Sequence, residues 1–161
     1  MNKVAFVLLI SICASCSTTY YVVRHAEKEV QQSNMTSDVP LSKEGGERAV
    51  ALGKQLENKK IRHLFSTNTI RTTSTAKPLS EATRIPVELY NPGDTNFINR
   101  MKALDGGNVL IVGHSNTVDN IVNGLMNKPV LKDLPDTQYG DLFIIKRKGN
   151  NYTFSRRHFG Q

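Results

Sequence analysis

The stretch VLIVGHSNTVDNIVNGL (residues 109–125) decides the fold class of this chain. It opens with a run of branched aliphatic residues, which predicts a strand buried on both faces. Apolar side chains then recur at the i, i+3, i+4, i+7 spacing of a helix with one buried face: Val118, Ile121, Val122 and Leu125. A buried strand that leads directly into an amphipathic helix is a repeating unit of α/β folds.

The same alternation continues on both sides of this stretch. The patterning predicts strands at residues 19–23, 61–66 and 86–89, and helices at residues 42–59, 69–81 and 97–104. Residues 142–145 and 152–159 are expected to form a terminal pair of strands around Gly149-Asn150. Pro78 implies a kink or an early end of the second helix. The predicted fold is therefore α/β, a three-layer sandwich with a mostly parallel central sheet and helices on both faces.

The composition is that of one globular domain with a basic excess. The 161 residues include 21 Lys and Arg against 14 Asp and Glu, a net charge of +7. This charge attracts anions, but it does not choose among phosphate esters, nucleic acid and an acidic membrane surface. Aromatic residues are not interleaved with the basic ones, so we expect no nucleic-acid partner. The sequence gives no indication of the oligomeric state.

The first sixteen residues are expected to lie outside the fold. Lys3, the apolar residues 4–12 and the small pair Ala14-Ser15 before Cys16 have the order of a signal peptide. The apolar run is far shorter than the ~20 residues that span a bilayer. Ala14-Ser15-Cys16 resembles a bacterial lipobox, which implies cleavage before Cys16 and acylation of its thiol. A buried strand at residues 4–12 and plain secretion after cleavage nearby are the alternatives.

This reading sets the expected domain boundaries and location. The folded domain is expected at residues 19–161, with residues 17–19 as a short tether. Cleavage removes Cys13 and acylation uses Cys16, so the mature domain has no free thiol and no disulfide. We expect an exported lipoprotein, held at the membrane in the periplasm or cell envelope.

Three expected strand ends carry matching chemistry. The first ends in Arg24-His25, the second leads to Arg71 in the first turn of a helix, and the third ends in Gly113-His114. Ligands of parallel sheets bind beyond the carboxyl ends of the strands. Two guanidinium groups and one imidazole there can donate hydrogen bonds to the oxygens of a phosphoryl group. The other imidazole, if neutral, can attack phosphorus.

At these residues the sequence resembles the histidine phosphatase superfamily, also called phosphoglycerate mutase-like, in its small single-domain branch. Arg24-His25 matches the family's Arg-His-Gly signature, with Ala26 in place of glycine. Three further segments match in order: DVPLSKEG (residues 38–45), STNTIRTTSTA (residues 66–76) and VLIVGHSNT (residues 109–117). YGDLF (residues 139–143) lies where small members enter a late strand.

The resemblance implies the roles of the site residues. His25 is the nucleophile that carries the phosphoryl group, and Arg24, Arg71 and His114 bind the phosphate. Ser115 adds a hydroxyl or backbone donor to the substrate site. The family works without a metal, and no other cofactor is implied. The partner is a small phosphorylated substrate.

The general acid that protonates the leaving oxygen is not identified by the sequence. Glu27, Asp94 and Asp119 are the candidates. Capping of the following helix is the favoured role of Asp94, and a structural or rim role is favoured for Glu27. Small members that resemble this chain often lack a clear acid and favour substrates with good leaving groups.

Three functions are therefore open. The first is a metal-independent phosphatase that hydrolyses phosphomonoesters through a phosphohistidine on His25. The second is a phosphatase of protein phosphohistidine, and the third is a non-catalytic phosphate-binding lipoprotein of the envelope. His63 and His158 are expected to be structural. The short basic clusters are expected to be solvated faces, or to contact anionic lipid headgroups or an anionic substrate: Lys59, Lys60, Arg62, residues 146–148, Arg156 and Arg157.

Overall fold

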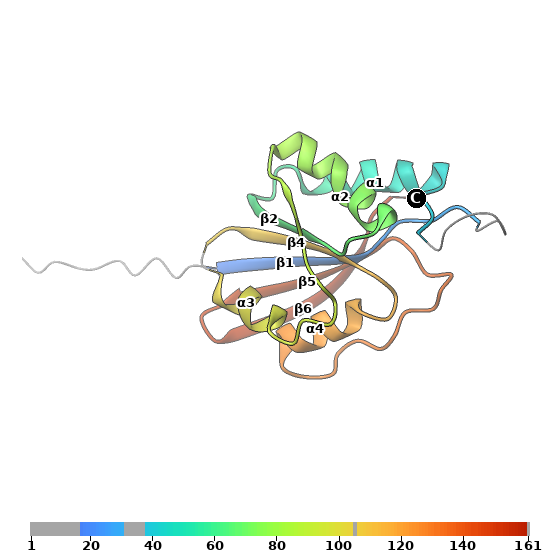
Figure 1. Cartoon of the computed structure of the whole chain (residues 1–161). Coiled ribbons are helices and arrows are strands. Elements are labelled where there is room, and N and C mark those ends of the chain that lie inside the picture. Colours follow the sequence, from blue (N-terminus) through green and yellow to red (C-terminus); the bar gives the residue numbers. More distant parts are fainter. Residues whose placement is uncertain (1–16, 31–37, 105, 161) are drawn as a thin grey trace, which may run out of the picture.

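A six-stranded sheet forms the centre of the molecule, seen in a computed structural model that describes residues 17–30, 38–104 and 106–160 (Figure 1). The strand order is β3-β2-β4-β1-β5-β6. The strands are β1 (Ser17–Arg24), β2 (Ile61–Ser66), β3 (Val87–Leu89), β4 (Asn108–Gly113), β5 (Asp141–Lys148) and β6 (Asn151–His158). The helices are α1 (Lys43–Leu56), α2 (Ile70–Thr83), α3 (Phe97–Ala103) and α4 (Val118–Met126).

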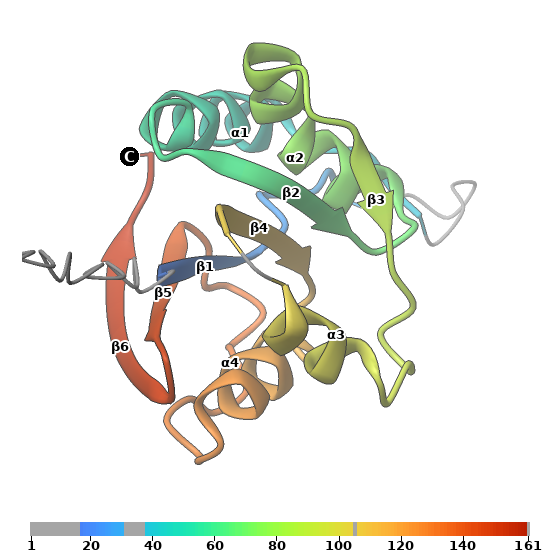
Figure 2. The ribbon, with the colours of Figure 1, turned by 90° about the vertical axis from the view of Figure 1, so that its left-hand side faces the viewer.

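The sheet is parallel except at one edge. The first four strands pair in parallel, whereas β5 runs antiparallel to both β1 and β6. The helices α1 and α2 lie on one face of the sheet, and α3 and α4 lie on the other (Figure 2). The predicted three-layer α/β sandwich is confirmed.

Each face of the sheet buries its own hydrophobic core. In β1 successive side chains alternate between the two: Tyr20 and Val22 pack on the α3–α4 side, and Tyr21 and Val23 on the α1–α2 side. This two-sided burial explains why β1 is a continuous apolar run rather than an alternating one. It also fixes the register of β1, so Arg24 leaves the sheet directly beside Gly113 of β4.

Two boundaries differ from the expectation. Ser17 and Thr18 already pair with Lys148 and Arg147 of β5, so these two residues belong to the strand and not to a tether. The helix α2 does not end early at Pro78 but continues to Thr83. Since α2 packs closely on α1 through this region, tertiary contacts outweigh the missing backbone donor of the proline.

The predicted signal peptide and lipidated Cys16 lie outside the described residues. Within the described ranges, every helix is too short or too polar to cross a bilayer.

Candidate active site

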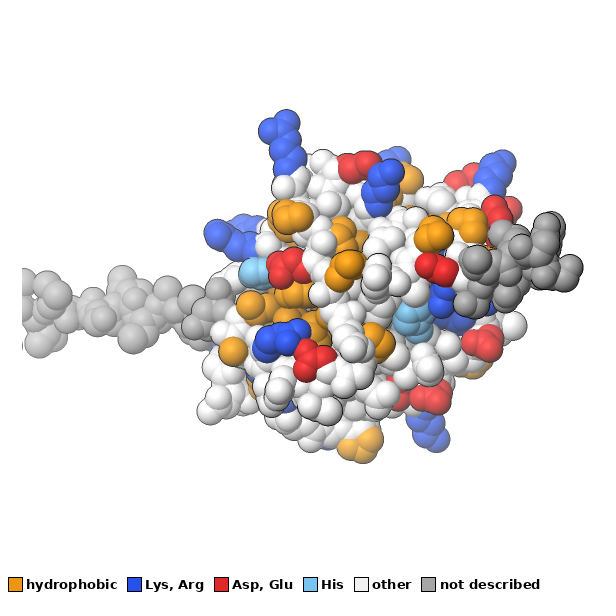
Figure 3. All heavy atoms as spheres, in the orientation of Figure 1, with side chains coloured by type: hydrophobic (Ala, Val, Ile, Leu, Met, Phe, Trp, Pro, Cys, Tyr) orange, Lys and Arg blue, Asp and Glu red, His pale blue; other side chains and the backbone are white. Residues whose placement is uncertain are grey.

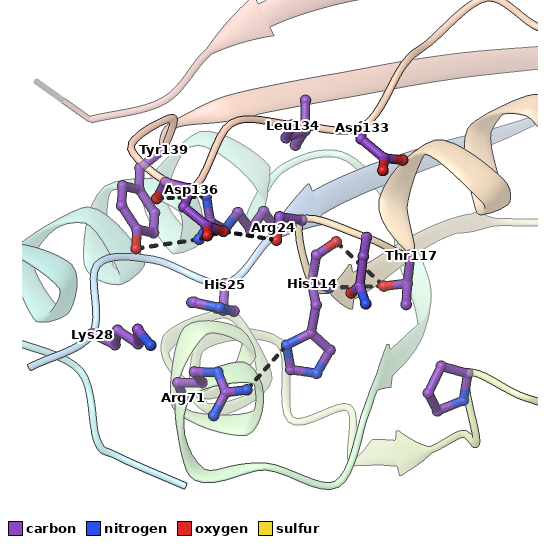
Figure 4. A pocket seen from close by; sticks show the side chains of 13 residues that line it. Arg24, His25, Lys28, Arg71, His114, Thr117, Asp133, Leu134, Asp136 and Tyr139 are labelled. Carbon is purple, nitrogen blue, oxygen red and sulfur yellow. Dashed lines mark hydrogen bonds and ion pairs between the residues drawn. The ribbon is translucent and has the colours of Figure 1, made fainter. Parts of the chain in front are cut away.

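The three predicted strand ends converge on one pocket of about 810 Å³ (Figure 4). It lies beyond the carboxyl ends of β1, β2 and β4, at one end of the sheet. The structure brings together all four residues of the predicted phosphate site, Arg24, His25, Arg71 and His114, and Ser115 with them. The full lining is Arg24, His25, Lys28, Arg71, Pro92, His114, Ser115, Asn116, Thr117, Asp133, Leu134, Asp136 and Tyr139.

His25 is held rigidly by its backbone and its ring. Its N–H donates to the carbonyl of Gly113 at 2.9 Å, which extends the β1–β4 ladder by one residue. Its Nδ1 lies 2.7 Å from the carbonyl oxygen of Ala26. The next peptide is tied to α2, because the Ala26 N–H donates to Thr75 Oγ1 at 3.0 Å. Thr75 lies in the segment 66–76 that the resemblance singled out, and here it holds the loop that follows His25.

Both pocket histidines are held neutral. Burial lowers the pKa of His25 to about 3, with the positive charges of Arg24 and Arg71 acting in the same direction. The carbonyl of Ala26 opposes this shift. Burial also lowers the pKa of His114 to about 4, again helped by the two guanidinium groups. A neutral imidazole keeps the lone pair that nucleophilic attack requires.

A hydrogen-bonded chain orients His114. Arg71 Nη2 lies 3.4 Å from His114 Nδ1, and a guanidinium can only donate, so Nδ1 accepts. The ring proton is then on Nε2, which lies 2.8 Å from Thr67 Oγ1. Thr67 in turn donates to Thr72 Oγ1 at 3.0 Å. The ring planes of His25 and His114 meet nearly edge to face, with centroids 5.4 Å apart.

Asp38 connects the segment 38–45 to the pocket. Its carboxylate accepts hydrogen bonds of 2.9 and 3.1 Å from the N–H of Ile70, the first residue of α2. It also lies 3.4 Å from Arg71 Nη1. Negative charge at a helix N-terminus is favourable, and the same group fixes the arginine. This explains why an aspartate stands at the start of the segment.

Arg24 is anchored to the loop between α4 and β5. Its Nη1 donates to three backbone carbonyls of that loop, at Pro135, Asp136 and Gln138, over 2.9 to 3.1 Å. Its guanidinium stacks on the Tyr139 ring, 4.2 Å from the centroid. Arg24 therefore shapes the pocket wall in addition to lining it.

Two donors in this site have no partner among the described residues. The Nε atoms of Arg24 and of Arg71 are buried and make no hydrogen bond within the described part of the chain. A buried charged donor without a partner is costly, on the order of 1–3 kcal/mol or more. An anion bound in the pocket, which both arginines line, would offer them acceptors.

None of the three candidate acids lines the pocket. Glu27 forms a bidentate pair with Arg48, with its oxygens 2.8 Å from Nε. Asp94 accepts from the N–H of Asn96 and pairs with Arg100 at 2.6 Å, at the start of α3. Asp119 is buried in the first turn of α4, and burial raises its pKa.

Among the lining residues with ionisable side chains, sequence reasoning missed four: Lys28, Asp133, Asp136 and Tyr139. Asp136 accepts from Ser115 Oγ at 3.3 Å and lies 3.6 Å from Arg24 Nη2. Asp133 and Asp136 belong to a polar loop that contains no recognisable sequence motif. Of the four, only Tyr139 could have been found from the sequence, through the YGDLF match. The loop becomes part of the site through its hydrogen bonds to Arg24.

The other two histidines lie away from the pocket. His63 stacks on Phe65 and lies 3.6 Å from Glu88, and His158 lies 3.3 Å from Arg48. Within the described ranges, no group of three or more His, Cys, Asp and Glu side chains is arranged to hold a metal ion.

Part of the chain matches a known family in sequence. The sequence model of the histidine phosphatase superfamily (branch 1) matches residues 20–91, which carry Arg24, His25 and Arg71. In this segment the chain is similar to the histidine phosphatase superfamily. No curated protein sequence matches the chain significantly.

Several solved structures share the fold. The protein histidine phosphatase SixA, solved with tungstate, has a TM-score of 0.70 at 18% identity over 87% of this chain and 96% of its own. A phosphoglycerate mutase from Bacillus anthracis str. Sterne has a TM-score of 0.64 at 18% identity, over 89% and 93%. A mycobacterial glucosyl-3-phosphoglycerate phosphatase has a TM-score of 0.62 at 12% identity, over 88% and 98%. At these identities the likeness shows the histidine phosphatase fold.

Proposed function

We propose that this protein is a histidine phosphatase that hydrolyses phosphomonoesters through a phosphohistidine on His25. The observation that carries the proposal is the pair of buried, unpartnered Nε–H groups of Arg24 and Arg71 beside two neutral imidazoles. The arginines offer donors to the equatorial oxygens of a phosphoryl group, where the charge of the transition state develops. His114 is held by Arg71 on the same side of the pocket.

The tautomer of His25 assigns the attacking atom. Because Nδ1 donates to the Ala26 carbonyl, Nε2 carries the lone pair. Nε2 forms a bond to phosphorus while the bond from phosphorus to the ester oxygen breaks. The leaving oxygen takes up a proton. Water then attacks phosphorus, the P–N bond breaks, and inorganic phosphate leaves as neutral His25 is restored.

The leaving group determines which esters are hydrolysed well. Glu27 and Asp94 are held in ion pairs outside the pocket, and Asp119 does not line it. Two other carboxyl groups, Asp133 and Asp136, line the pocket, and Asp136 accepts from Ser115 Oγ and lies 3.6 Å from Arg24 Nη2. Where none of these groups delivers a proton, an alkoxide leaves slowly, whereas a phenolate or another stabilised anion leaves readily. We therefore propose substrates whose leaving group carries its own stabilisation.

A phosphoramidate such as protein phosphohistidine is the second candidate. The observation in its favour is the same absence of the candidate acids from the pocket lining, because an imidazole leaves without an acid that protonates oxygen. SixA, which has the same fold, is a protein histidine phosphatase.

We also propose that the enzyme is exported and lipid-anchored in the cell envelope. The support is the order of residues 1–16, which ends in Cys16 directly before β1. Mass spectrometry of the mature N-terminus tests this. The expected result is a diacylglyceryl-modified Cys16, and an unmodified N-terminus at Met1 would contradict the proposal.

The decisive experiment compares His25→Ala with His63→Ala on p-nitrophenyl phosphate. The His25 variant is expected to lose activity by at least about 1,000-fold, as for other catalytic nucleophiles. The His63 variant, altered outside the pocket, is expected to keep it. Brief reaction with labelled substrate should trap an acid-labile phosphoryl group on His25.

The three functions give different outcomes. If the parent and the His25 variant hydrolyse the substrate at equal rates, His25 is not catalytic. The non-catalytic phosphate-binding function would then be the one that remains. Label on another residue would refute His25 as nucleophile. Faster turnover of a phosphohistidine peptide than of any ester would favour the second candidate.

A further inference from the structure

A second hollow, of about 300 Å³, lies on the α1 side of the sheet between the C-terminal part of α1 and the edge strands. It is separate from the active site and shares none of its lining residues. The hollow is lined by Tyr21, Gln55, Leu56, Lys59, Leu142, Ile144, Lys146, Ser155 and Arg157. We call these residues the cationic hollow.

The hollow exists because the helices do not cover the sheet edge on this side. The core under α1 and α2 reaches Leu142 and Ile144 of β5 but includes no residue of β6. The apolar residues of β6, Tyr152 and Phe154, pack against the core on the opposite face. On the α1 side, β6 presents the exposed side chains of Ser155 and Arg157 instead.

The chemistry of the hollow fits an anion. Its rim carries three exposed cations, Lys59, Lys146 and Arg157, and its lining contains no Asp or Glu. Its accessible surface is mainly polar, because Leu56, Leu142 and Ile144 lie buried beneath it. Tyr21 adds a hydroxyl whose side chain is only 8% exposed and which has no hydrogen-bond partner among the described residues.

The chain enters the fold beside this hollow. Ser17, the first residue of β1, pairs with Lys148, and Thr19 pairs with Lys146. Lys148 lies two residues beyond Lys146 on β5, so its exposed side chain is on the same face of the sheet. Sixteen residues precede Ser17, and the last of them is Cys16. Figure 3 shows the other side of the molecule, nearest β3, where Lys and Arg side chains lie scattered among Asp and Glu side chains.

We propose that the cationic hollow binds the headgroups of an anionic phospholipid surface. Lys59, Lys146 and Arg157 would contact the lipid phosphates, and the tyrosine hydroxyl would donate to one of them. The chain enters the fold at Ser17, directly after Cys16 and beside Lys146 and Lys148, so the observations favour a lipid surface over a soluble anion.

The proposal gives the enzyme an orientation. The hollow contacts β1 at Tyr21, on the α1 side of the sheet, whereas the active site is lined by Arg24 and His25 at the end of the same strand. An enzyme seated on lipid through the hollow would hold its catalytic pocket away from the bilayer. The proposal does not depend on the phosphatase reaction.

Vesicle co-sedimentation of the full chain tests the proposal. Binding to phosphatidylcholine vesicles is compared with binding to vesicles that also contain phosphatidylglycerol, because residues 4–12 contribute equally to both. The parent should prefer the anionic vesicles, and added salt should weaken that preference. The triple variant K59Q/K146Q/R157Q should reduce the preference about 100-fold, since each basic residue near an anionic surface contributes about fivefold.

The matched control is K43Q/K77Q/K132Q, which removes three exposed lysines outside the hollow. It should keep most of the preference, and both variants should hydrolyse p-nitrophenyl phosphate like the parent. Equal losses in the two triple variants, or equal binding of the parent to both vesicles, would overturn the proposal. If the triple variant does not fold, Lys146→Gln and Arg157→Gln alone should each cost about fivefold, and no loss in either would also overturn it.

Discussion

The Nδ1 atom of His25 lies 2.7 Å from the carbonyl oxygen of its neighbour Ala26. A carbonyl only accepts, so this contact places the ring proton on Nδ1 and leaves Nε2 as the basic atom. Burial and two nearby guanidinium groups then keep the ring uncharged. This short local contact thus determines which nitrogen has the lone pair. The tertiary environment keeps the ring uncharged, so that the lone pair remains available for attack on phosphorus.

The titration of the pocket histidines should be displaced far below the ordinary value. Because burial lowers the pKa of His25 to about 3 and that of His114 to about 4, both stay neutral at pH 5 and above. The unfolded chain takes up protons on these rings below pH 6.5, whereas the folded protein does so only near pH 4 and 3. The free energy of unfolding is therefore highest above pH 6.5 and falls as the pH drops from 6.5 toward 4 and 3. NMR titration of the ring resonances checks this. A midpoint near 6.5 for either residue would contradict it.

Asp38 should affect catalysis through charge and stability through hydrogen bonding. Asp38→Ala removes both its acceptor for the Ile70 N–H and its pairing with Arg71. We expect an unfolding free energy lower by about 1 kcal/mol and a KM raised about tenfold. Asp38→Asn keeps an acceptor, so it should recover the stability but not the KM. Equal KM values in the two variants and the parent would refute the role of the charge.

Thr67 should act as a positioning residue for His114. Thr67→Val removes the hydroxyl that His114 Nε2 contacts at 2.8 Å. A buried donor left unpaired costs about 1–3 kcal/mol, so kcat/KM should fall about tenfold or more. Thr67→Ser keeps the hydroxyl and should restore most of the activity. If valine and serine variants are equally active, the contact does not matter for catalysis.

Gly45 and Gly46 form a matched pair within one helix. A Cβ at Gly45 would lie 2.0 Å from the carbonyl oxygen of Glu27, whereas one at Gly46 meets nothing within 4 Å. Gly45→Ala should therefore destabilise the fold by about 1–3 kcal/mol. Gly46→Ala should stabilise it by about 0.5–1 kcal/mol, because alanine favours the helix. Chemical denaturation measures both, and equal effects would contradict the close approach.

Much of the fold was predictable because burial on both sides leaves a continuous apolar signature. Residues 109–112 could only be an inner strand, and β4 is indeed central. The helix predicted at residues 69–81 does not end early at Pro78, because packing against α1 overrides local propensity. The candidate acids Glu27 and Asp119 lie close to the histidines in sequence, and Asp94 lies between Arg71 and His114. Their side chains are held by partners such as Arg48 and Arg100, which sequence spacing does not reveal.

The sequence by itself determined the α/β class, the resemblance to a family, and the four residues that lie at or follow the ends of neighbouring strands, with Arg71 in the first turn of α2. These features are predictable because the hydrophobic pattern identifies the strands, and parallel pairing brings their carboxyl ends to one edge of the sheet regardless of loop conformation. Only the tertiary structure decided the neutrality of His25, the anchoring of Arg24 to residues 135–138, and the uncovered cationic hollow beside β6. These depend on desolvation and on contacts between distant segments, which the order of residues along the chain does not specify.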